Sequence, residues 1–441
     1  MGEVINIERM AYGPEAIGHL ASGKTVFVSG AAPGDACEIE VTEDKGSFAR
    51  ARLVELKEGS SVRVAPQSPI DQVCGTAPWQ HISYEAQLDF KRDNVVGALV
   101  HTAGFSEEQA RELVAPCAAS KRQWGYRNKL ELAVGTDAAG AFELGFHREG
   151  TDEFVAADSS KLAHKQIERA PKALRGAIRY GQGNQDLGIF RIGVRHSLAT
   201  GECEVALWTR PGKFPRALFA KTIGSAVKAT SVVRVLADPG KARKVKGVEV
   251  LDGRGFWRER MGECEFSTAA PSFFQVNTAQ ANRLVEEVIR GLGGEQGIEG
   301  AYVADLYAGG GTFSIPLARA GADVVAVEAA GSSVRDLRFN ADLNGVEIDV
   351  VGGDAARELA MLEDLDALVV DPPRAGLAKE VPGLIAQASP EKVAYVSCNP
   401  STWARDIARF AEQGYELESA TPVDLFPQTY HVEVASILAR R

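Results

Sequence analysis

The alternation of strand-like and helix-like segments after residue 266 most constrains what this 441-residue chain can fold into. Buried-strand runs lie at 302–307, 323–328, 365–370 and 392–397, and helical spacing is clearest at 332–344 and 402–413. Strands that alternate with helices predict a parallel, doubly wound α/β sheet. Such sheets bind ligands at the carboxyl ends of their strands, so the residues after each strand are the first candidates for chemistry.

A glycine-rich loop follows the first of these strands, in the run 305–313. The glycines at 309–311 let the backbone approach a ligand where a Cβ atom would clash. Glu328 ends the next strand, where a carboxylate can accept the hydroxyls of a ribose. Asp305 ahead of the loop disfavours a pyrophosphate but suits a cationic sulfonium, so S-adenosylmethionine is favoured over a dinucleotide. A glycine turn that only packs a helix is the structural alternative.

Two later strand ends carry further reactive groups. Asp371 is followed by two prolines, which fix the backbone and hold its carboxylate at the sheet edge. Cys398 precedes a helix, and a thiol near a helix N-terminus tends toward the thiolate. A lone cysteine is more often a small buried core residue, but this one shares the edge with the glycine loop and Asp371. We therefore interpret Cys398 as a nucleophile.

The sequence divides into three predicted domains. Residues 1–58 hold short strand-like runs between glycine turns, which suits a small closed barrel of the oligonucleotide-binding kind. Residues 59–265 mix a helical stretch at 83–100 with alternating strands, which predicts a central α+β domain. Within it, the segment at about 94–122 is a candidate to pack with the catalytic domain, residues 266–441.

Charge and cysteine usage limit the function classes. The net charge of −10 opposes nucleic-acid binding, yet residues 206–247 hold ten Lys or Arg against one acid, and residues 160–180 hold six against one. These blocks predict a basic face on an otherwise acidic protein, with solvated helix faces as the alternative. The six cysteines form no Cys-x-x-Cys pair, so neither a disulfide framework nor a zinc site is predicted. Without a bilayer-length apolar run or a visible secretory signal, a cytoplasmic protein is expected.

Five motifs together resemble the RNA uracil-C5 methyltransferase family, whose members make 5-methyluridine. In the family's order and spacing, they are residues 272–277, 305–313, 371–376, 397–400 and 426–433. The N-terminal barrel is similar to the TRAM domain that many members carry, so the resemblance spans nearly the whole chain. It implies a Rossmann-like class I methyltransferase domain that uses S-adenosylmethionine to methylate C5 of a uridine in RNA.

The resemblance also implies roles for single residues. Cys398 would add to C6 of the uracil, which makes C5 electron-rich, and Glu433 would remove the C5 proton. The uridine must leave its stack so that both groups can reach it. Six residues would line the cofactor pocket, although Thr312 stands where some members have asparagine: Gln275, Tyr307, Thr312, Glu328, Asp354 and Asp371.

One departure from the family concerns iron. Several members bind a [4Fe-4S] cluster through Cys-x5-Cys-x2-Cys and a fourth, later cysteine. The corresponding run at 68–77 retains only Cys74, and the fourth position is Ser160. One thiolate cannot hold such a cluster, so we expect no iron–sulfur centre and no other metal. Packing and hydrogen bonds must then hold this segment.

Three other protein classes are alternatives to an RNA uracil-C5 methyltransferase. An exocyclic-amine methyltransferase usually has an aromatic residue after Asp-Pro-Pro, where Arg374 stands here. A cytosine-C5 enzyme commonly has a cysteine in or beside that motif, which has none. An RNA-binding protein with a relic methyltransferase fold is disfavoured because Cys398 and Glu433 are both present.

The kind of RNA is inferred from family analogy alone. A TRAM-like barrel favours 23S ribosomal RNA over transfer RNA. The expected partner is therefore RNA, with no membrane, and the expected protein is a monomer.

Overall fold

The computed structural model describes residues 2–240 and 244–441. The chain divides into two compact units, each assembled from segments distant in sequence. The first comprises Met1–Gln123, Glu286–Gly294 and Leu362–Arg441, and the second comprises Trp124–Val285 and Glu295–Met361. Each unit buries an apolar core of its own.

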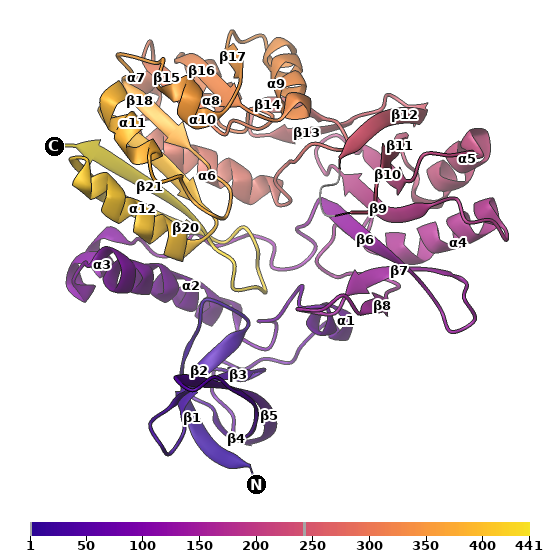
Figure 1. Cartoon of the computed structure of the whole chain (residues 1–441), viewed down its shortest axis with the longest axis horizontal. Helices are drawn as coiled ribbons and strands as arrows, with labels where there is room; N and C mark the ends of the chain where they lie inside the picture. Colours follow the sequence, from indigo (N-terminus) through magenta and orange to yellow (C-terminus); the bar gives the residue numbers. More distant parts are fainter. Residues whose placement is uncertain (1, 241–243) are drawn as a thin grey trace. The chain divides into compact units, whose positions relative to one another are not determined.

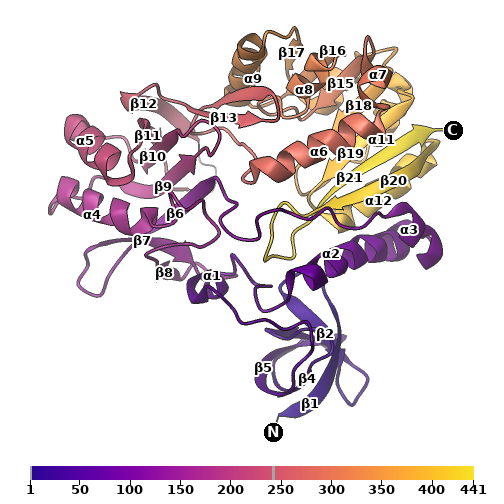
Figure 2. The same cartoon turned by 180° about the vertical axis from the view of Figure 1, so that it is seen from behind.

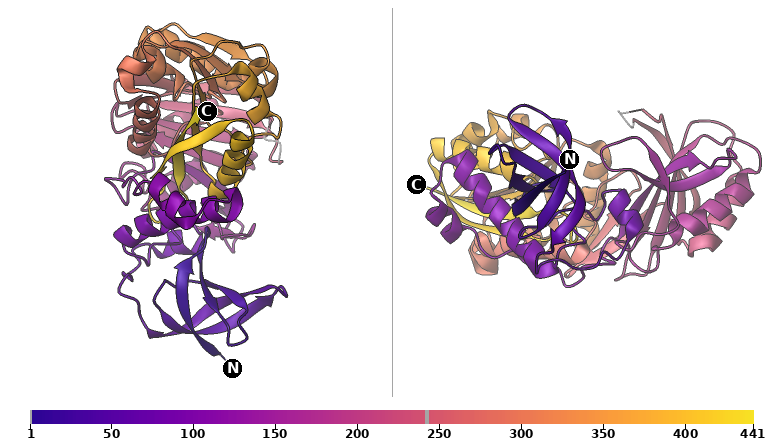
Figure 3. Two further views of the ribbon diagram at one scale, coloured as in Figure 1. Left: turned by 90° about the vertical axis from the view of Figure 1, so that its left-hand side faces the viewer. Right: turned by 90° about the horizontal axis from the view of Figure 1, so that it is seen from below.

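The first unit begins with the predicted barrel. Its strands are β1 (Glu3–Met10), β2 (Glu15–His19), β3 (Thr25–Ser29), β4 (Ala36–Asp44) and β5 (Phe48–Glu58), closed in the order β1-β2-β3-β5-β4 (Figures 1 and 3). Alternate side chains point inward, so that Ile5, Val26, Val28 and Ile39 are buried. A Cβ atom on Gly18 would lie 2.6 Å from a carbonyl oxygen of β1, so this close strand contact requires glycine.

Helices follow the barrel in the same unit. They are α1 (Pro69–Val73), α2 (Tyr84–Ala98), the π-helical turn η1 (Leu99–Ala103) and α3 (Glu107–Leu113), so the helix predicted at 83–100 is confirmed. Trp79 and Ile82, just ahead of α2, join the barrel core. After α3, Val114 and Ala118 form bridges with β20 (Tyr415–Val423).

The predicted central domain, residues 59–265, is therefore divided. Residues 59–123 belong to the compact unit of the barrel and the C-terminal strands, and residues 124–265 belong to the other. The physical reason is that buried side chains of α2 find their partners in the C-terminal part of the chain.

Four C-terminal strands complete the first unit. β18 (Ala367–Val370), β19 (Lys392–Ser397), β21 (Glu433–Arg440) and β20 lie side by side in that order (Figure 2). The parallel pair β18–β19 is joined through α11 (Val381–Ala388), and α12 (Pro400–Glu412) leads from β19 to β20. β21 is antiparallel to both neighbours, so the predicted parallel sheet is mixed at this end. No helix separates β20 from β21, and a direct connection returns a strand antiparallel.

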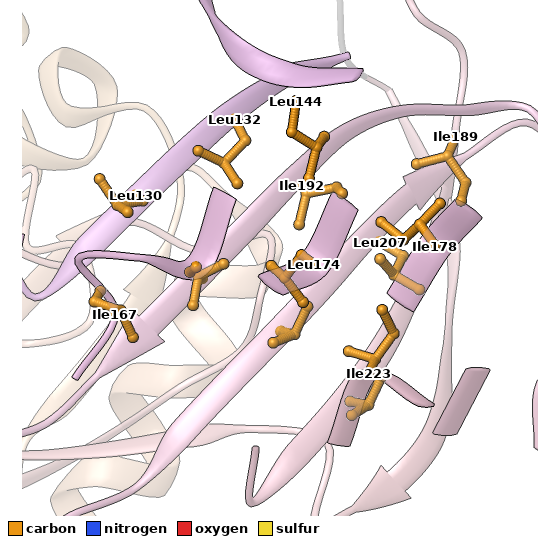
Figure 4. Packing of buried hydrophobic residues seen from close by; sticks show 14 of the residues in the cluster. Leu130, Leu132, Leu144, Ile167, Leu174, Ile178, Ile189, Ile192, Leu207 and Ile223 are labelled. Carbon is orange, nitrogen blue, oxygen red and sulfur yellow. The ribbon is translucent and has the colours of Figure 1, made fainter. Parts of the chain in front are cut away.

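The second unit contains the central sheet. Its order is β12-β11-β10-β9-β6-β7-β8, and β6 and β7 pair as an antiparallel hairpin. Helices α4 (Ala170–Gln182) and α5 (Arg216–Val227) contribute Leu174, Ile178 and Ile223 to a core with the sheet (Figure 4). The strands are β6 (Lys129–Thr136), β7 (Phe142–His147), β8 (Phe154–Ala156), β9 (Ile189–His196), β10 (Cys203–Thr209), β11 (Ser231–Ala237) and β12 (Val245–Gly253).

The rest of the second unit has the predicted α/β alternation. β15 (Tyr302–Leu306), β16 (Asp323–Glu328) and β17 (Asp349–Gly352) are parallel, with β16 in the middle. α8 (Ser314–Arg319), α9 (Gly331–Asn344) and α10 (Ala355–Leu359) follow them in turn. A hairpin of β13 (Trp257–Met261) and β14 (Cys264–Thr268) precedes them, followed by α6 (Thr278–Gly291) and α7 (Gly294–Ile298). The end of α6, from Glu286, and Gly294 belong to the first unit. Among the described residues, no helix is long and apolar enough to cross a membrane.

Candidate active site

Cys398 and Glu433 meet at one edge of the first unit's sheet. β19 ends at Ser397, which pairs with Val434 of the antiparallel strand β21. One step beyond this pair, Cys398 comes opposite Glu433, the first residue of β21. Cys398 is half-buried and Glu433 is buried, with 6% of its surface exposed. The structure thus brings the two predicted catalytic residues together.

The thiol of Cys398 is held in its protonated form. Burial raises the pKa of Cys398 to about 11; the Glu433 carboxyl raises this pKa further, and Arg374 lowers it. Helix α12 begins at Pro400, with Asn399 as its cap. Burial and the acidic neighbours thus oppose the shift toward the thiolate that is expected from the helix N-terminus.

Glu433 is a carboxyl group of unusually high proton affinity. Burial raises the pKa of Glu433 well above its usual range, Asp371 raises it further, and Arg374 lowers it. Asp371 directly follows β18 and also raises the pKa of Cys398. A carboxylate in such surroundings is a stronger base than one in water, as proton abstraction near neutral pH requires.

A buried charge pair supports the loop that leads to Glu433. Lys91 of α2 donates hydrogen bonds to the Asp424 carboxylate and, over 3.1 Å, to the carbonyl of Phe426. The hydroxyl of Tyr84 donates to Asp424 Oδ2 over 2.7 Å. Both charged side chains are fully buried, so removing either one would leave the charge of the other buried and unpaired.

A second set of bonds fixes the next turn of this loop. Gln428 adopts φ 70°, which a residue with a Cβ atom rarely adopts. Its backbone amide donates to Gln87 Oε1 over 2.9 Å, and its carbonyl accepts from the Trp79 amide over 2.9 Å. Tyr84, Gln87 and Lys91 follow one face of α2, so polar residues at helical spacing were the sequence signal for this support.

In the second unit, candidate cofactor residues occupy the carboxyl ends of three adjacent parallel strands. Tyr307 follows β15, Glu328 ends β16, and Asp354 lies two residues after β17. The register pairs Leu306 with Val327 and Glu328 with Gly352, so the three ends are level. Thr312 lies in the loop between β15 and α8. This edge is where an α/β sheet binds its ligand.

Glu328 and a strained backbone shape the glycine loop. Glu328 Oε2 accepts from the Gly309 amide over 2.9 Å, and Oε1 accepts from the Ala330 amide over 2.6 Å. Tyr307 has φ 64°, a strained value for a residue with a side chain and typical of functional loops. A Cβ atom on Gly311 would lie 2.6 Å from Leu337, so this position requires glycine.

Asp305 lies beneath the loop rather than in it. Burial raises the pKa of Asp305 to about 7, and the Ser314 hydroxyl donates to its Oδ2 atom. Its negative charge is therefore weaker than the sequence argument assumed. Its Oδ1 atom is buried and has no hydrogen-bond partner among the described residues. An orphan acceptor below a strained, glycine-lined loop suits a ligand that brings a hydrogen-bond donor.

The two remaining cofactor candidates of this unit, Gln275 and Asp354, differ in burial. Gln275 is buried, and its carbonyl accepts from the Asn128 side chain over 2.8 Å. The guanidinium of Arg195 donates to the nearby carbonyl of Ser272, so the central sheet holds this motif in place. Asp354 is exposed and uses Oδ1 to cap the N-terminus of α10. Asp371, the sixth predicted residue, lies in the first unit with the catalytic pair.

The predicted basic face is partly neutralised by acids that the fold brings to it. Arg175 and Arg179 of the first block pair with Glu143 over 2.9 Å and 2.6 Å. Arg234 of the second block is buried and pairs with Glu249 over 3.2 Å. Both acids lie outside the sequence windows in which the charges were counted, so those windows overstated the excess of positive charge.

Comparison with known protein families shows to which family this chain belongs. A family model described as tRNA (uracil-5-)-methyltransferase matches residues 259–441, and the TRAM domain model matches residues 4–54. An uncharacterized RNA methyltransferase of Gloeobacter violaceus is 33% identical over 454 residues, covering 99% of this chain and 96% of the relative. The chain belongs to the RNA uracil-C5 methyltransferase family. A second such relative, from Chlorobaculum tepidum, is 32% identical and covers 97% of this chain and 94% of its own.

A solved structure agrees with this family. The Pyrococcus abyssi tRNA (uracil-54, C5)-methyltransferase, in complex with S-adenosyl-L-homocysteine, has a TM-score of 0.78 and 26% identity over 99% of each chain. These comparisons confirm the predicted TRAM domain, the Rossmann-like methyltransferase fold, the activity as an RNA methyltransferase and the dependence on S-adenosylmethionine.

The segment where several family members carry cluster cysteines is a hydrogen-bonded loop here. Buried Asp71 accepts from the hydroxyls of Ser68, over 2.6 Å, and Thr76, over 2.9 Å. The Gln80 amide donates to the Ser68 carbonyl over 2.8 Å. Ser68 thus serves the hydrogen-bonded structure of the loop. Among the described residues, no group of three or more His, Cys, Asp or Glu side chains is placed to hold a metal ion.

Proposed function

We propose that this enzyme methylates C5 of a specific uridine in 23S ribosomal RNA, with Cys398 as nucleophile and Glu433 as base. The observation that carries the chemistry is the pairing of a half-buried thiol with a buried, high-pKa carboxyl group at one sheet edge. A uracil ring needs both: a nucleophile for C6 and a base for the proton on C5.

The residues would act in a fixed order. The Cys398 thiol releases its proton to solvent, and the thiolate bonds to C6 as the C5=C6 double bond opens, which makes C5 electron-rich. Arg374 lowers the pKa of both Cys398 and Glu433 and so favours the anions that the reaction needs. Once C5 carries its new methyl group, the Glu433 carboxylate removes the C5 proton, and the C6–S bond breaks to return the Cys398 thiolate. The proton taken up by Glu433 then leaves to solvent.

The residues at the three parallel strand ends fit the cofactor. When bound, S-adenosylmethionine supplies an electrophilic methyl group. Glu328 would accept the ribose hydroxyls, because each of its carboxylate oxygens accepts one backbone amide and has a lone pair left. Tyr307, Thr312, Asp354 and Gln275 would line the same pocket, and Asp371 is assigned to the cofactor by the family resemblance alone.

The choice of RNA rests on family analogy. The TRAM barrel supports ribosomal RNA by family analogy. Transfer RNA is the second candidate, favoured by the full-length similarity to the Pyrococcus abyssi enzyme, whose substrate is a tRNA. We further propose that the enzyme works in the cytoplasm, where both RNAs are found.

Mapping 5-methyluridine in a strain that lacks the gene tests this proposal. We expect one or more 5-methyluridines of 23S ribosomal RNA to disappear, and to return with the wild-type gene but not with Cys398→Ala. Loss confined to transfer RNA would replace the substrate and keep the chemistry. Unchanged 5-methyluridine in both RNAs would contradict the proposed function.

A further inference from the structure

The N-terminal barrel reaches the nucleophile through one side chain. Tyr12 lies in the turn between β1 and β2, and its hydroxyl donates a hydrogen bond of 2.9 Å to the backbone carbonyl of Cys398. Its ring packs edge-on against Tyr430, with the ring centroids 5.7 Å apart. The barrel therefore contributes a direct contact to the residue that attacks the substrate.

The turn that carries Tyr12 is held firmly. Trp79 is fully buried, and its indole N–H donates to the carbonyl of Gly13 over 3.0 Å. The backbone amide of Trp79 donates to Gln428 in the loop before Glu433. One buried residue thus joins the Tyr12 turn to the loop that carries the base. A hydroxyl on such a fixed turn can hold the Cys398 carbonyl in one place.

The protonation state of Tyr12 suits a permanent donor. Burial raises the pKa of Tyr12 far above its usual value, and the Cys398 thiol and the Glu433 carboxyl raise it further. Arg374 acts in the opposite direction. The phenol therefore keeps its proton through the neutral and mildly alkaline range, and it can donate to a carbonyl oxygen throughout.

The charge of the barrel argues against a simpler role in gripping RNA phosphates. Residues 1–58 contain ten acids and six Lys or Arg. Phosphate binding requires cations that are free to replace counterions. Five of the six cations are already engaged in ion pairs with acids: Lys24, Lys45, Arg50, Arg52 and Lys57.

We propose that Tyr12 is a positioning residue for the nucleophile, so that the barrel takes part in the attack on the uracil. The inference rests on the proposed function, in which Cys398 attacks C6. The hydrogen bond fixes the backbone from which the thiol projects. The positive end of the O–H dipole also partly offsets the negative carbonyl oxygen of the residue on which the thiolate must form.

The Tyr12→Phe variant removes the hydroxyl and keeps the ring. With RNA that contains 5-fluorouridine, we expect adduct formation to slow by about tenfold, the scale for the loss of one hydrogen bond at a reaction centre. We expect the pH profile of that rate to move to higher pH, while RNA affinity stays within about twofold of wild type. Tyr180→Phe is the matched control, because Tyr180 is 75% exposed on α4 of the second unit.

Alkylation of Cys398 by iodoacetamide, quantified by mass spectrometry across a pH series, gives a second reading without RNA. The account predicts a higher apparent thiol pKa in Tyr12→Phe than in wild type. Wild-type rates and pH profiles in the variant would overturn the inference. Weakened RNA affinity with an unchanged pH profile would also overturn it and would assign Tyr12 to RNA contact. Absence of an adduct in the wild-type enzyme would instead refute the proposed function.

Discussion

The catalytic edge around Cys398 and Glu433 and the glycine loop around Glu328 are built in opposite ways. In the glycine loop the decisive bonds are local: Glu328 and Gly309 are 19 residues apart, and Ser314 and Asp305 are 9 apart. At the catalytic edge, Tyr12 reaches Cys398 across 386 residues, and Lys91 reaches Asp424 across 333. The glycine loop is thus shaped by nearby sequence, whereas the surroundings of Cys398 depend on segments from both ends of the chain.

The largest effect is expected from Glu433→Gln, which changes the catalytic edge and leaves the glycine loop intact. The amide cannot take the C5 proton, so turnover should fall on the order of a hundredfold to ten-thousandfold. The neutral side chain should not slow the thiol, because the Glu433 carboxyl raises the pKa of Cys398. A covalent protein–RNA complex should therefore accumulate on ordinary uridine, visible as a shifted band on a denaturing gel.

Glu418→Gln is the control for that variant, because Glu418 is an exposed acid on the neighbouring strand β20. It should turn over like wild type and trap no RNA. Normal turnover by Glu433→Gln without an adduct would assign the base to another residue.

Lys91→Met tests whether the buried pair of Lys91 and Asp424 stabilises the catalytic edge. It leaves the Asp424 carboxylate buried without its cation, so the free energy of unfolding should fall by about 3–5 kcal/mol. The double variant Lys91→Met/Asp424→Asn should regain most of this loss, because it removes both charges. Chemical denaturation of the three proteins measures the effect. Equal stability of Lys91→Met and wild type would show that the pair does not hold the catalytic edge.

A smaller effect is expected at the glycine loop. Glu328→Gln loses one of two charge-assisted bonds, and the dissociation constant for S-adenosylmethionine should rise about tenfold, the scale of one hydrogen bond to a charged group. Asp323→Asn makes the same acid-to-amide change at the other end of β16 and should leave affinity unchanged. Titration calorimetry that finds equal affinities in the two variants would remove Glu328 from the cofactor site.

The same contrast explains what could be predicted from the sequence. The glycine loop, the strands of the α/β domain and the barrel were readable, because each is specified by spacing within a few tens of residues. The polar face of α2 is visible in the sequence, but the pairing of Lys91 with Asp424 is not, because no spacing rule connects positions so far apart. The thiol was expected to be acidic because its helix is visible in the sequence, but the burial that raises its pKa to about 11 is not.

The most direct test of the account is to find which residue bonds to the uracil. Fluorine at C5 cannot be removed as a proton, so the enzyme should stall as a covalent adduct with 5-fluorouridine RNA in the presence of S-adenosylmethionine. We expect mass spectrometry to find the adduct on Cys398, and we expect Cys398→Ala to form none. Because the pKa of Cys398 lies near 11, the thiolate fraction, and with it the rate of adduct formation, should rise as pH increases from neutrality. An adduct on another cysteine such as Cys117, or no adduct at any pH, would contradict the account.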